Sequence, residues 1–547
     1  MSNNKIFSLG IEFSTQSVKL IVLDIERGDT VYKNKFDYDK EFPEYHTEGG
    51  VLKNTLPEIR HTSSYMLIES LDCVFKKLLN DSIDLNQIYI IKIDAMQHCT
   101  VYANGLFKCI LKNLDSGNGL LKQLKPGITR STIPIWEDRS PIEEVKFLTG
   151  ILKKKDRIIK LTGNKAELRF PAAQIIKWAK ESPEEYKATS HIFLLSAFLT
   201  SILIGKIAPV DTGDGWGTNL NTLNIKYPQW NKIVLKSIDG YLNKSSFYSP
   251  LEEKIGKMVD YDTVAGSVCN YFIKKYGVNP HATVLVGTGD NPATLLGCGG
   301  NIVISLGSSY TVNGAIKEIT PSISGEYNIF GYTRGRAMAL SVFTNGGKVH
   351  EHFLKKYITK SSIAEITKKD WDLYVQSVGK SEISSQDKIM LPYLLDESTP
   401  LCKKGIVRDD FKEDEKETNI RALHLSFALA LKAHSSHLSK VNTLCIAAGG
   451  SKNPVLRQWI SDAFNAKSYT IKNSEYAAPL GCAISGALFL TKTSYKEAVA
   501  KYVQIEKESF IKPIPENVKG MKFLITYYNE LEQKHLKTWG GETLCIN

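Results

Sequence analysis

A short polar segment, GTGDNP at residues 287 to 292, has residue types and spacing that suit acid–base chemistry on a hydroxyl group. It follows the apolar run 283–286, and its two glycines let the chain turn sharply after a strand. Asp290 can take a proton from a hydroxyl, and Asn291 can grip a neighbouring hydroxyl with its donor and its acceptor. A structural interpretation stays open, in which the same residues cap a helix that begins near Ala293.

Two further segments suit the binding of phosphate groups. Residues 6–24 and 302–316 share an apolar strand, the string Ser-Leu-Gly, a hydroxyl-rich turn and a second apolar strand. Glycine lets the backbone approach a phosphate and the hydroxyls add donors, so segments 10–16 and 307–311 can clamp a triphosphate from two sides. Two ordinary hairpins are the structural alternative. The copies stand about three hundred residues apart, a domain-sized period that indicates duplicated halves.

A third turn, AAGGSKNP at residues 447 to 454, joins a strand to a helix N-terminus through two glycines. It can receive a nucleotide base or ribose without obstruction by side chains, although alone it is also an ordinary tight turn. The sequence contains no GxxxxGK[ST] string and no GxGxxG string after a strand. The common single-domain nucleotide-binding folds therefore lose their main support.

Alternating helical and strand-like segments predict the elements that position these turns. Apolar residues recur at helical spacing over 65–79, and a β-rich run follows at 88–93. That run ends in Asp-Ala-Met-Gln-His at 94–98, at the carboxyl end of a predicted strand, where α/β sheets place ligand contacts. Similar units recur at 282–290 and 443–450, and 420–434 predicts a long buried helix. An α/β fold follows.

The length and composition predict two large globular domains. A chain of 547 residues exceeds the size at which single cores stop growing, about 250 to 300 residues. A hydrophobic fraction of 42% is that of an ordinary globular protein, so a sizeable core can form. Gly297, Gly299, Gly300 and Asn301 break the pattern and place the boundary between domains 1–299 and 300–547.

Charge and cysteine usage bear on the partners and the location. The net charge of +11 is a mild bias over this length, which favours anionic small molecules, and no nucleic-acid module is visible. The nine cysteines form no CxxC pair, so reduced thiols are expected rather than disulfides or a zinc site. No signal-like segment and no membrane-length apolar run occur, which predicts a cytoplasmic protein without a membrane partner.

Eight segments, taken in order, resemble the FGGY carbohydrate kinases, and within that family the eukaryotic xylulose kinases are the most similar. The segments extend over nearly the whole chain, and their shared order carries the resemblance because each string alone is unspecific. They are LGIEFSTQ (9–16), MQHCTVY (96–102), PIWEDRS (134–140), LTGNKAELRF (161–170), DGWGTNL (214–220), TGDNPAT (288–294), SLGSSYT (305–311) and AAGGSKN (447–453).

The resemblance implies a fold and an activity. The implied fold is α/β, with duplicated actin-like ATPase (ribonuclease H-like) domains on either side of an interdomain cleft. The domain 1–299 would hold the sugar site and the first phosphate turn, and the domain 300–547 would hold the second phosphate turn and the adenosine site. The implied reaction is ATP-dependent phosphorylation of D-xylulose to D-xylulose 5-phosphate, with Mg2+. The implied partners are a small sugar and ATP, and the protein is expected as a monomer or homodimer.

Site residues carry over at matched positions only. Asp290 is then the catalytic base, and Glu12 faces the metal. The sugar contacts are Gln97, His98, Arg169 and Asn291. The nucleotide contacts are Gly10, Ser14, Thr15 and Gln16 in the first phosphate turn, Gly307, Ser308 and Ser309 in the second, and Gly449 and Gly450 under the adenosine.

Several positions depart from the family pattern. Glu12 stands where the family has Asp, and a displaced metal can cost about a hundredfold in rate. Tyr310 replaces a smaller residue and is expected to crowd the phosphates, and the glycine turn at 449–453 is one residue shorter than usual. Two alternatives therefore stay open: a catalytically weak sugar- or nucleotide-binding regulator, and a kinase for another ketose or polyol.

Overall fold

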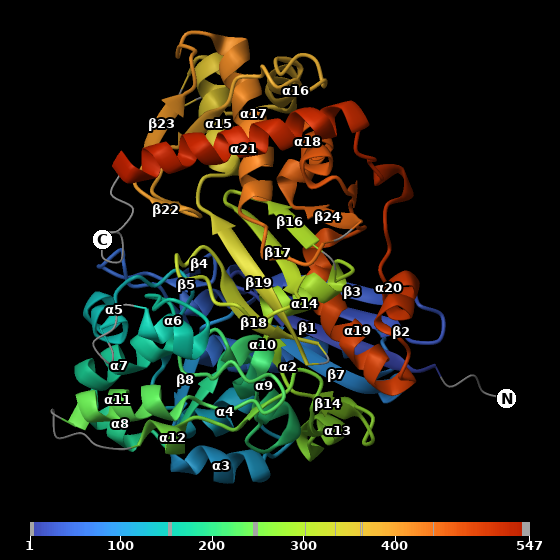
Figure 1. Ribbon diagram of the computed structural model, residues 1–547. Coiled ribbons are helices and arrows are strands. Elements are labelled where there is room, and N and C mark those ends of the chain that lie inside the picture. Colours follow the sequence, from blue (N-terminus) through green and yellow to red (C-terminus); the bar gives the residue numbers. More distant parts are fainter. Residues whose placement is uncertain are drawn as a thin grey trace.

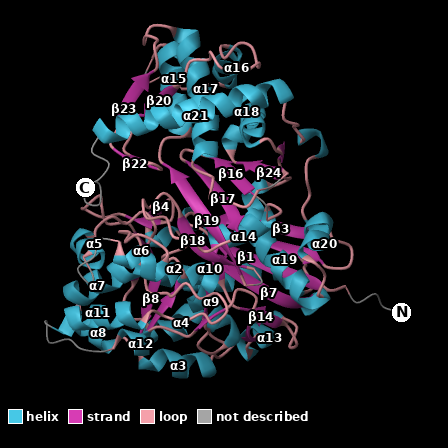
Figure 2. Ribbon diagram, viewed as in Figure 1, coloured by secondary structure: helices cyan, strands magenta, loops and turns pink. Residues whose placement is uncertain are grey.

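Two mixed β-sheets, one in each half of the chain, form the framework of the computed structural model (Figures 1 and 2). The structure describes residues 5–150, 156–243, 250–300, 302–333, 335–361, 363, 365–440 and 442–538. The N-terminal half lies below and the C-terminal half above in Figure 1. The predicted α/β class is confirmed, whereas the domain boundary at 299/300 stays a prediction.

The N-terminal sheet has seven strands in the order β13-β14-β7-β1-β2-β3, with β15 also pairing with β7. β2 is antiparallel to both of its neighbours, β1 and β3, and β7 runs parallel to β1. The apolar residues predicted at 88–93 fall in β7, which is buried. The strands are β1 (Phe7–Phe13), β2 (Ser17–Asp24), β3 (Thr30–Asp37), β7 (Ile88–Ala95), β13 (Val264–Ser267), β14 (Thr283–Leu285) and β15 (Thr288–Gly289).

The C-terminal sheet has six strands in the order β18-β19-β17-β16-β24-β25. It repeats the plan of the first sheet, because a hairpin of β16 and β17 is extended antiparallel by β19, while β24 runs parallel to β16. The shared topology agrees with duplicated halves. The strands are β16 (Ile302–Leu306), β17 (Tyr310–Ile316), β18 (Asn328–Tyr332), β19 (Arg336–Phe343), β24 (Thr443–Ala447) and β25 (Lys467–Tyr469).

Helices cover both sheets and carry the apolar faces that the sequence predicts. Helix α2 begins at a Ser63 cap, whose side chain accepts from the backbone N–H of Met66, and it packs its buried face on the N-terminal core. The longer N-terminal helices are α2 (Ser64–Asn80), α3 (Gly105–Lys112), α5 (Ile142–Thr149), α6 (Arg157–Thr162), α7 (Pro171–Glu181), α8 (Pro183–Ala188), α9 (Leu195–Ile204), α11 (Lys232–Asn243), α13 (Asn270–Tyr276) and α14 (Asp290–Gly297), with the short α10 (Thr212–Gly215).

The C-terminal helices include one that crosses to the other half. The predicted helix at 420–434 is confirmed as α17, whose middle is buried. These helices are α15 (Gly347–Leu354), α16 (Lys368–Gln376), α17 (Lys416–Ala433), α18 (Pro454–Phe464), α19 (Ala477–Thr491), α20 (Tyr495–Tyr502) and α21 (Pro515–Thr538). Helix α19 packs on β1 and β7 of the N-terminal sheet and on α14, so a helix of the C-terminal half covers the first sheet, whereas the last helix, α21, returns to α17 and α18 (Figure 1).

Glycines allow this close crossing. A Cβ on Gly297 would lie 1.8 Å from the carbonyl oxygen of Ala477, and one on Gly481 would lie 1.9 Å from that of Ala293. A Cβ on Gly10 would likewise lie 1.8 Å from the carbonyl oxygen of Pro479. Helices α14 and α19 and strand β1 are therefore in backbone contact where the two halves meet.

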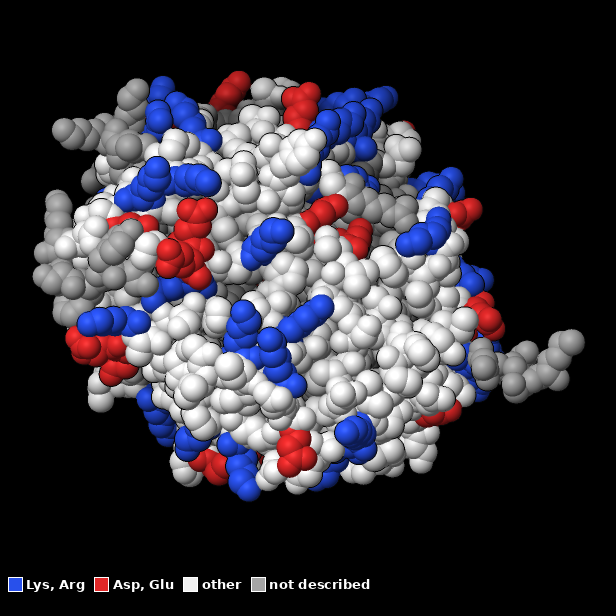
Figure 3. Space-filling view, turned by 90° about the horizontal axis from the view of Figure 1, so that it is seen from below, with Lys and Arg blue, Asp and Glu red and all other residues white. Residues whose placement is uncertain are grey.

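Surface charge and thiols agree with an ordinary globular surface. On the face shown in Figure 3, Lys and Arg side chains are scattered among acidic and neutral residues. The eight cysteines within the described ranges are free thiols, most of them buried, while Cys545 lies outside those ranges. No helix in the described part of the chain is both long enough and apolar enough to cross a membrane.

Candidate active site

Asp290 is the first residue of helix α14, directly after the short strand β15. The helix N-cap is Gly289, which has no side chain to make a capping bond, so Asp290 is in the first turn and is not the N-cap residue. Its carboxylate accepts hydrogen bonds from the backbone N–H groups of Asn291 and Gln97. Burial, and next the charge of Glu12, raise the pKa of Asp290 to about 7. A carboxyl group with such a pKa can accept a proton near neutral pH.

Gln97 and Asn291 form a polar pair beside this carboxyl group. The Asn291 amide donates to Asp290 Oδ1 at 3.0 Å and to Gln97 Oε1 at 2.7 Å. The Gln97 amide in turn donates to the carbonyl oxygen of Gly213 in α10 at 2.9 Å. The turn that carries Asp290 is therefore tied to the end of β7 and to α10.

His98 is held in one tautomer next to the same turn. Its backbone has a φ of 74°, in the left-handed region, and its ring stacks on Phe170 with centroids 4.5 Å apart. Burial, and then the charge of Arg169, lower the pKa of His98 to about 3, so the ring is neutral. Nδ1 lies 2.8 Å from the carbonyl oxygen of Gly217, which can only accept, so Nδ1 donates and Nε2 is left as an acceptor.

Arg169 lies on the wall of a cleft between the two halves. Its Nε is buried and has no hydrogen-bond partner among the described residues. The cleft has a volume of about 910 Å³, and its N-terminal wall includes Trp136 and Lys165 in addition to Arg169. Its C-terminal wall is formed by 323–328 and 395–399, together with single residues of β19. An unpaired donor at this wall suits an oxygen-rich ligand.

The first phosphate turn joins β1 to β2. The Ser14 hydroxyl donates to the carbonyl oxygen of Ser17 at 2.7 Å, and Thr15 Oγ1 accepts from the Trp136 indole at 3.0 Å. Gln16 is exposed. Gly10 lies inside β1, three residues before the end of the strand, where its missing side chain admits α19. The structure therefore brings Ser14, Thr15 and Gln16 together at the turn and leaves Gly10 beneath a helix.

Glu12 belongs to a group of largely buried charges on three neighbouring strands, β2, β1 and β7. Its Oε2 forms an ion pair with Lys19 Nζ at 2.9 Å, and burial raises its pKa while Lys19 opposes that rise. Asp94 is its register partner on β7, fully buried, with Oδ1 unpartnered within the described residues. Burial and the charges of Glu12 and Asp290 raise the pKa of Asp94 well above its usual value. Sequence reasoning missed Lys19, and it included Asp94 in the strand end at 94–98 without assigning it a role.

The second phosphate turn, Gly307 to Ser309, connects β16 to β17. Its hydroxyl-bearing residues are exposed, and the backbone N–H of Gly347 at the start of α15 donates to the carbonyl oxygen of Gly307 at 3.0 Å. The expectation that Tyr310 crowds the phosphates is wrong. Tyr310 starts β17 and is 1% exposed, and its ring packs on Phe427 at 5.1 Å inside the C-terminal core.

The turn predicted to lie under the adenosine follows β24. Gly449 is exposed with nothing within 4 Å of a Cβ position, whereas a Cβ on Gly450 would lie 2.6 Å from the Leu306 side chain. Asn453 caps α18 by accepting from the backbone N–H groups of Val455 and Leu456, and its amide lies 2.9 Å from His424 Nε2. Gly449 is thus open to a ligand, while Gly450 and Asn453 are engaged with the protein.

Curated proteins match the chain over nearly its full length, although no model of a protein family matches it. "Xylulose kinase 2" of Arabidopsis thaliana is 28% identical over 503 residues, covering 88% of this chain and 86% of the relative. "Xylulose kinase" of Rattus norvegicus is 27% identical over 549 residues, covering 97% and 98%. "D-xylulose kinase A" of Aspergillus niger is 26% identical over 542 residues, covering 92% and 93%.

Solved structures share the fold. A ligand-bound xylulose kinase from Lactobacillus acidophilus superposes with a TM-score of 0.77 at 16% identity, covering 98% of this chain and 99% of that one. A xylulose kinase from Rhodospirillum rubrum gives 0.78 at 13% identity, covering 97% and 99%. Plasmodium falciparum glycerol kinase with ADP gives 0.73 at 15% identity, covering 97% and 98%. These likenesses confirm the predicted α/β fold with duplicated actin-like ATPase domains.

Proposed function

We propose that the chain is an FGGY carbohydrate kinase, which transfers the γ-phosphoryl group of ATP to the 5-hydroxyl of D-xylulose. The observation that carries this proposal is the turn at Asp290. Its carboxyl group has a pKa of about 7 and accepts from the Asn291 amide at 3.0 Å, and the same amide bonds Gln97, which directly precedes the neutral His98. Curated relatives named for xylulose kinase supply the substrate class.

In the proposed reaction the sugar hydroxyl loses a proton and its oxygen gains the phosphoryl group. Asp290 accepts the proton of the 5-hydroxyl as that oxygen forms a bond to the γ-phosphorus. The bond from the γ-phosphorus to the bridging oxygen breaks, and ADP leaves with the electron pair. His98 Nε2 and Asn291 Oδ1 accept from sugar hydroxyls, and the Arg169 Nε donates to a sugar oxygen. Arg169 then gains the partner that it lacks within the protein.

The two turns that join the hairpin strands are proposed to hold the phosphates. Thr15 and Gln16 present donors from the N-terminal half, where the bonds from Ser14 to the carbonyl oxygen of Ser17 shape the turn, and Ser308 and Ser309 present donors from the C-terminal half. Gly449 offers an unobstructed surface for the adenosine. Closure of the cleft around both ligands excludes water and limits wasteful hydrolysis.

Mg2+ fits the buried carboxylates of this site. Glu12 and the unpartnered Asp94 oxygen are hard oxygen donors of the kind that Mg2+ prefers. No three His, Cys, Asp or Glu side chains of the described ranges are arranged to hold a metal by themselves. Mg2+ usually binds one or two protein carboxylates together with water and phosphate oxygens, so two carboxylates are enough for such a site. When bound, Mg2+ would neutralise charge on the transferring phosphates.

A coupled assay of ADP release tests the proposal directly. The purified protein would be supplied with ATP, Mg2+ and, in separate reactions, D-xylulose, D-ribulose, gluconate or glycerol. We expect D-xylulose to give the highest kcat/KM, and calorimetric titration without ATP to show the tightest binding for the same sugar. Preference for another polyol would keep the kinase and change the substrate. Absence of ADP release with every sugar would refute the proposed activity.

A further inference from the structure

The side chain of Gln97 uses its polar atoms on the protein itself. It is 2% exposed, its amide donates to the carbonyl oxygen of Gly213, and its Oε1 accepts from the Asn291 amide. A sugar ligand would have to compete with both of these bonds. The Gln97 side chain therefore links two segments of the chain by hydrogen bonds and has its amide engaged within the protein, which is not expected of a side chain that binds the sugar.

The surrounding backbone is shaped to admit this side chain. A Cβ on Gly289 would lie 2.4 Å from Gln97 Cγ, and a Cβ on Gly213 would lie 2.4 Å from Thr288 Oγ1. Contacts this short do not occur between real Cβ atoms and their neighbours, so glycine is required at both positions. The two glycines let β15, α10 and the Gln97 side chain approach one another.

Gln97 also acts on the base from its backbone. Its N–H donates to the Asp290 carboxylate, and the Asn291 amide that Gln97 fixes donates to Oδ1 of the same carboxylate. A continuous chain of hydrogen bonds therefore runs from Gly213 through Gln97 and Asn291 to Asp290. Because every member is held from two sides, the direction of the Asp290 carboxylate is set before a ligand arrives.

Helix α10, at the far end of that chain, touches the C-terminal half. A Cβ on Gly331 of β18 would lie 2.2 Å from Thr212 Cβ, so the edge strand of the C-terminal sheet lies directly on α10. Asn164 binds the same pair of elements, since its amide donates to the carbonyl oxygens of Trp216 at 2.8 Å and Ile329 at 3.1 Å. The hydrogen-bonded chain thus starts where the two halves meet.

We propose that Gln97 is a positioning residue, which aims the Asp290 carboxylate through Asn291 and anchors it to the helix on which the C-terminal sheet rests. This role rests on the proposed kinase function and replaces the sugar contact that the family resemblance implies for Gln97. The sugar is then gripped by His98, Arg169 and Asn291. Gln97 sets the rate of the chemical step and leaves the affinity for the sugar nearly unchanged.

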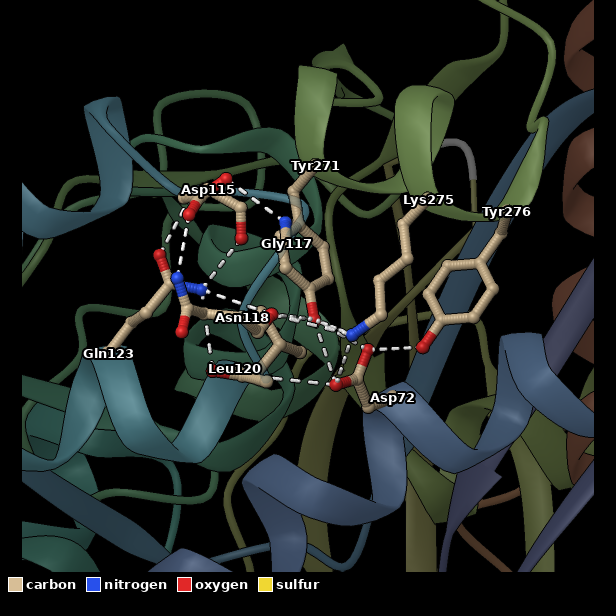
Figure 4. A network of polar contacts seen from close by, with 10 residues as sticks. Asp72, Asp115, Gly117, Asn118, Leu120, Gln123, Tyr271, Lys275 and Tyr276 are labelled. Atoms are coloured by element: carbon tan, nitrogen blue, oxygen red, sulfur yellow. Dashed lines mark hydrogen bonds and ion pairs between the residues drawn. The ribbon is translucent and has the colours of Figure 1, made fainter.

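The test compares Gln97→Met with a matched glutamine elsewhere. Gln123 is also bonded at both ends of its amide, to the backbone of Asp115, in the network of Figure 4 around Asp72 and Tyr271. Gln123→Met removes the same groups at a distance from the proposed site. Gln97→Asn, which stays polar but is too short for both bonds, replaces Gln97→Met if the latter does not fold.

We expect Gln97→Met to lower the single-turnover rate about a hundredfold, the usual cost of displacing a catalytic group by about an ångström. The Kd for D-xylulose should change less than threefold, and Gln123→Met should match the parent in both. A loosened bond from the Asn291 amide to Asp290 Oδ1 should also move the acid limb of the rate profile to higher pH, because a hydrogen bond donated to a carboxylate lowers its pKa. A Kd raised tenfold, with the rate restored at saturating sugar, would make Gln97 a ligand and overturn the proposal.

A direct titration separates this proposal from the proposed function. The carboxyl carbon of Asp290, labelled with 13C and assigned with Asp290→Asn, reports its pKa by NMR without any substrate. A higher pKa in Gln97→Met than in the parent supports the positioning role even if D-xylulose is not phosphorylated. Equal pKa values in the two proteins would refute that role, whatever sugar the enzyme uses.

Discussion

The two halves share a hairpin and a parallel partner strand, but they use the hairpin turn differently. In the N-terminal half the turn at Ser14 to Gln16 is braced by Trp136, and buried charges lie behind it. In the C-terminal half the turn at Gly307 to Ser309 is exposed, with an apolar core behind it. Duplication has therefore kept the backbone plan and assigned the acid–base groups to one copy.

The Ser-Leu-Gly strings, which first suggested duplication, do not occupy equivalent places in the two hairpins. β1 continues for three residues beyond Gly10, and its turn follows Phe13. β16 ends at Leu306, so Gly307 is already in the turn. The topology, rather than the string, is what the two halves have in common.

The largest expected effect is that of Asp290→Asn, in the half that carries the acids. Loss of a general base costs about a hundredfold to ten-thousandfold in rate, and single-turnover kinetics with D-xylulose would measure it. Ser309→Ala, in the opposite turn, is the matched comparison and should cost less than tenfold. Near-parental phosphorylation by Asp290→Asn would move the base elsewhere and remove the asymmetry between the halves.

The same substitution should affect stability in a pH-dependent way. The pKa of Asp290 is raised in the folded protein, so the folded state holds a proton that the unfolded chain releases above about pH 4. The stability that this proton contributes is complete at low pH and is lost as the pH rises toward 7. Thermal melts should therefore show Asp290→Asn to be more stable than the parent at pH 8, by a margin that shrinks toward pH 4. A margin independent of pH would contradict the raised pKa.

Glu12→Gln tests whether the buried charges of the N-terminal half act together. The charge of Glu12 helps to raise the pKa of Asp290, so its removal should move the acid limb of kcat/KM to lower pH, opposite to the shift expected for Gln97→Met. The Mg2+ concentration for half-maximal rate should rise about tenfold with the loss of a carboxylate ligand. Lys35→Met, on the exposed strand β3, is a control that should change neither value.

How far the sequence predicts the site depends on whether its residues are neighbours along the chain. The Asp290-Asn291 turn, Gln97-His98 and the hydroxyl-rich turns follow apolar strands directly, so the local pattern identifies them. The contact of Glu12 with Asp94 depends on the register of β1 against β7, some eighty residues later, which no local pattern specifies. The bond from Gln97 to Gly213 likewise depends on tertiary packing.

The elements were predicted more fully than their side-chain directions. The helix at 65–79, the strand at 88–93 and the helix at 420–434 are observed as α2, β7 and α17, since long periodic segments bury one face whatever their partners are. The direction of Tyr310 was mispredicted. It is the first residue of β17, and alternation along the strand turns it toward the core, whereas the sequence alone leaves open whether it belongs to the turn.

The smallest expected effect is that of Tyr310→Phe, which tests the C-terminal turn. If the ring crowded the phosphates, removal of its hydroxyl would change the affinity for nucleotide. In the structure the ring lies between Phe427 and His350, on the core side of the strand. The Kd for ATP, measured by calorimetry, should therefore stay within twofold of the parent, and the rate at saturating ATP should be unchanged. Ser309→Ala, the preceding residue on the exposed side of the turn, should weaken ATP more than Tyr310→Phe does. If Tyr310→Phe weakened ATP binding more than Ser309→Ala, the tyrosine would lie in the nucleotide site and the serine outside it. The second turn would then contact its ligand with a buried side chain, as is proposed for the first half of the molecule.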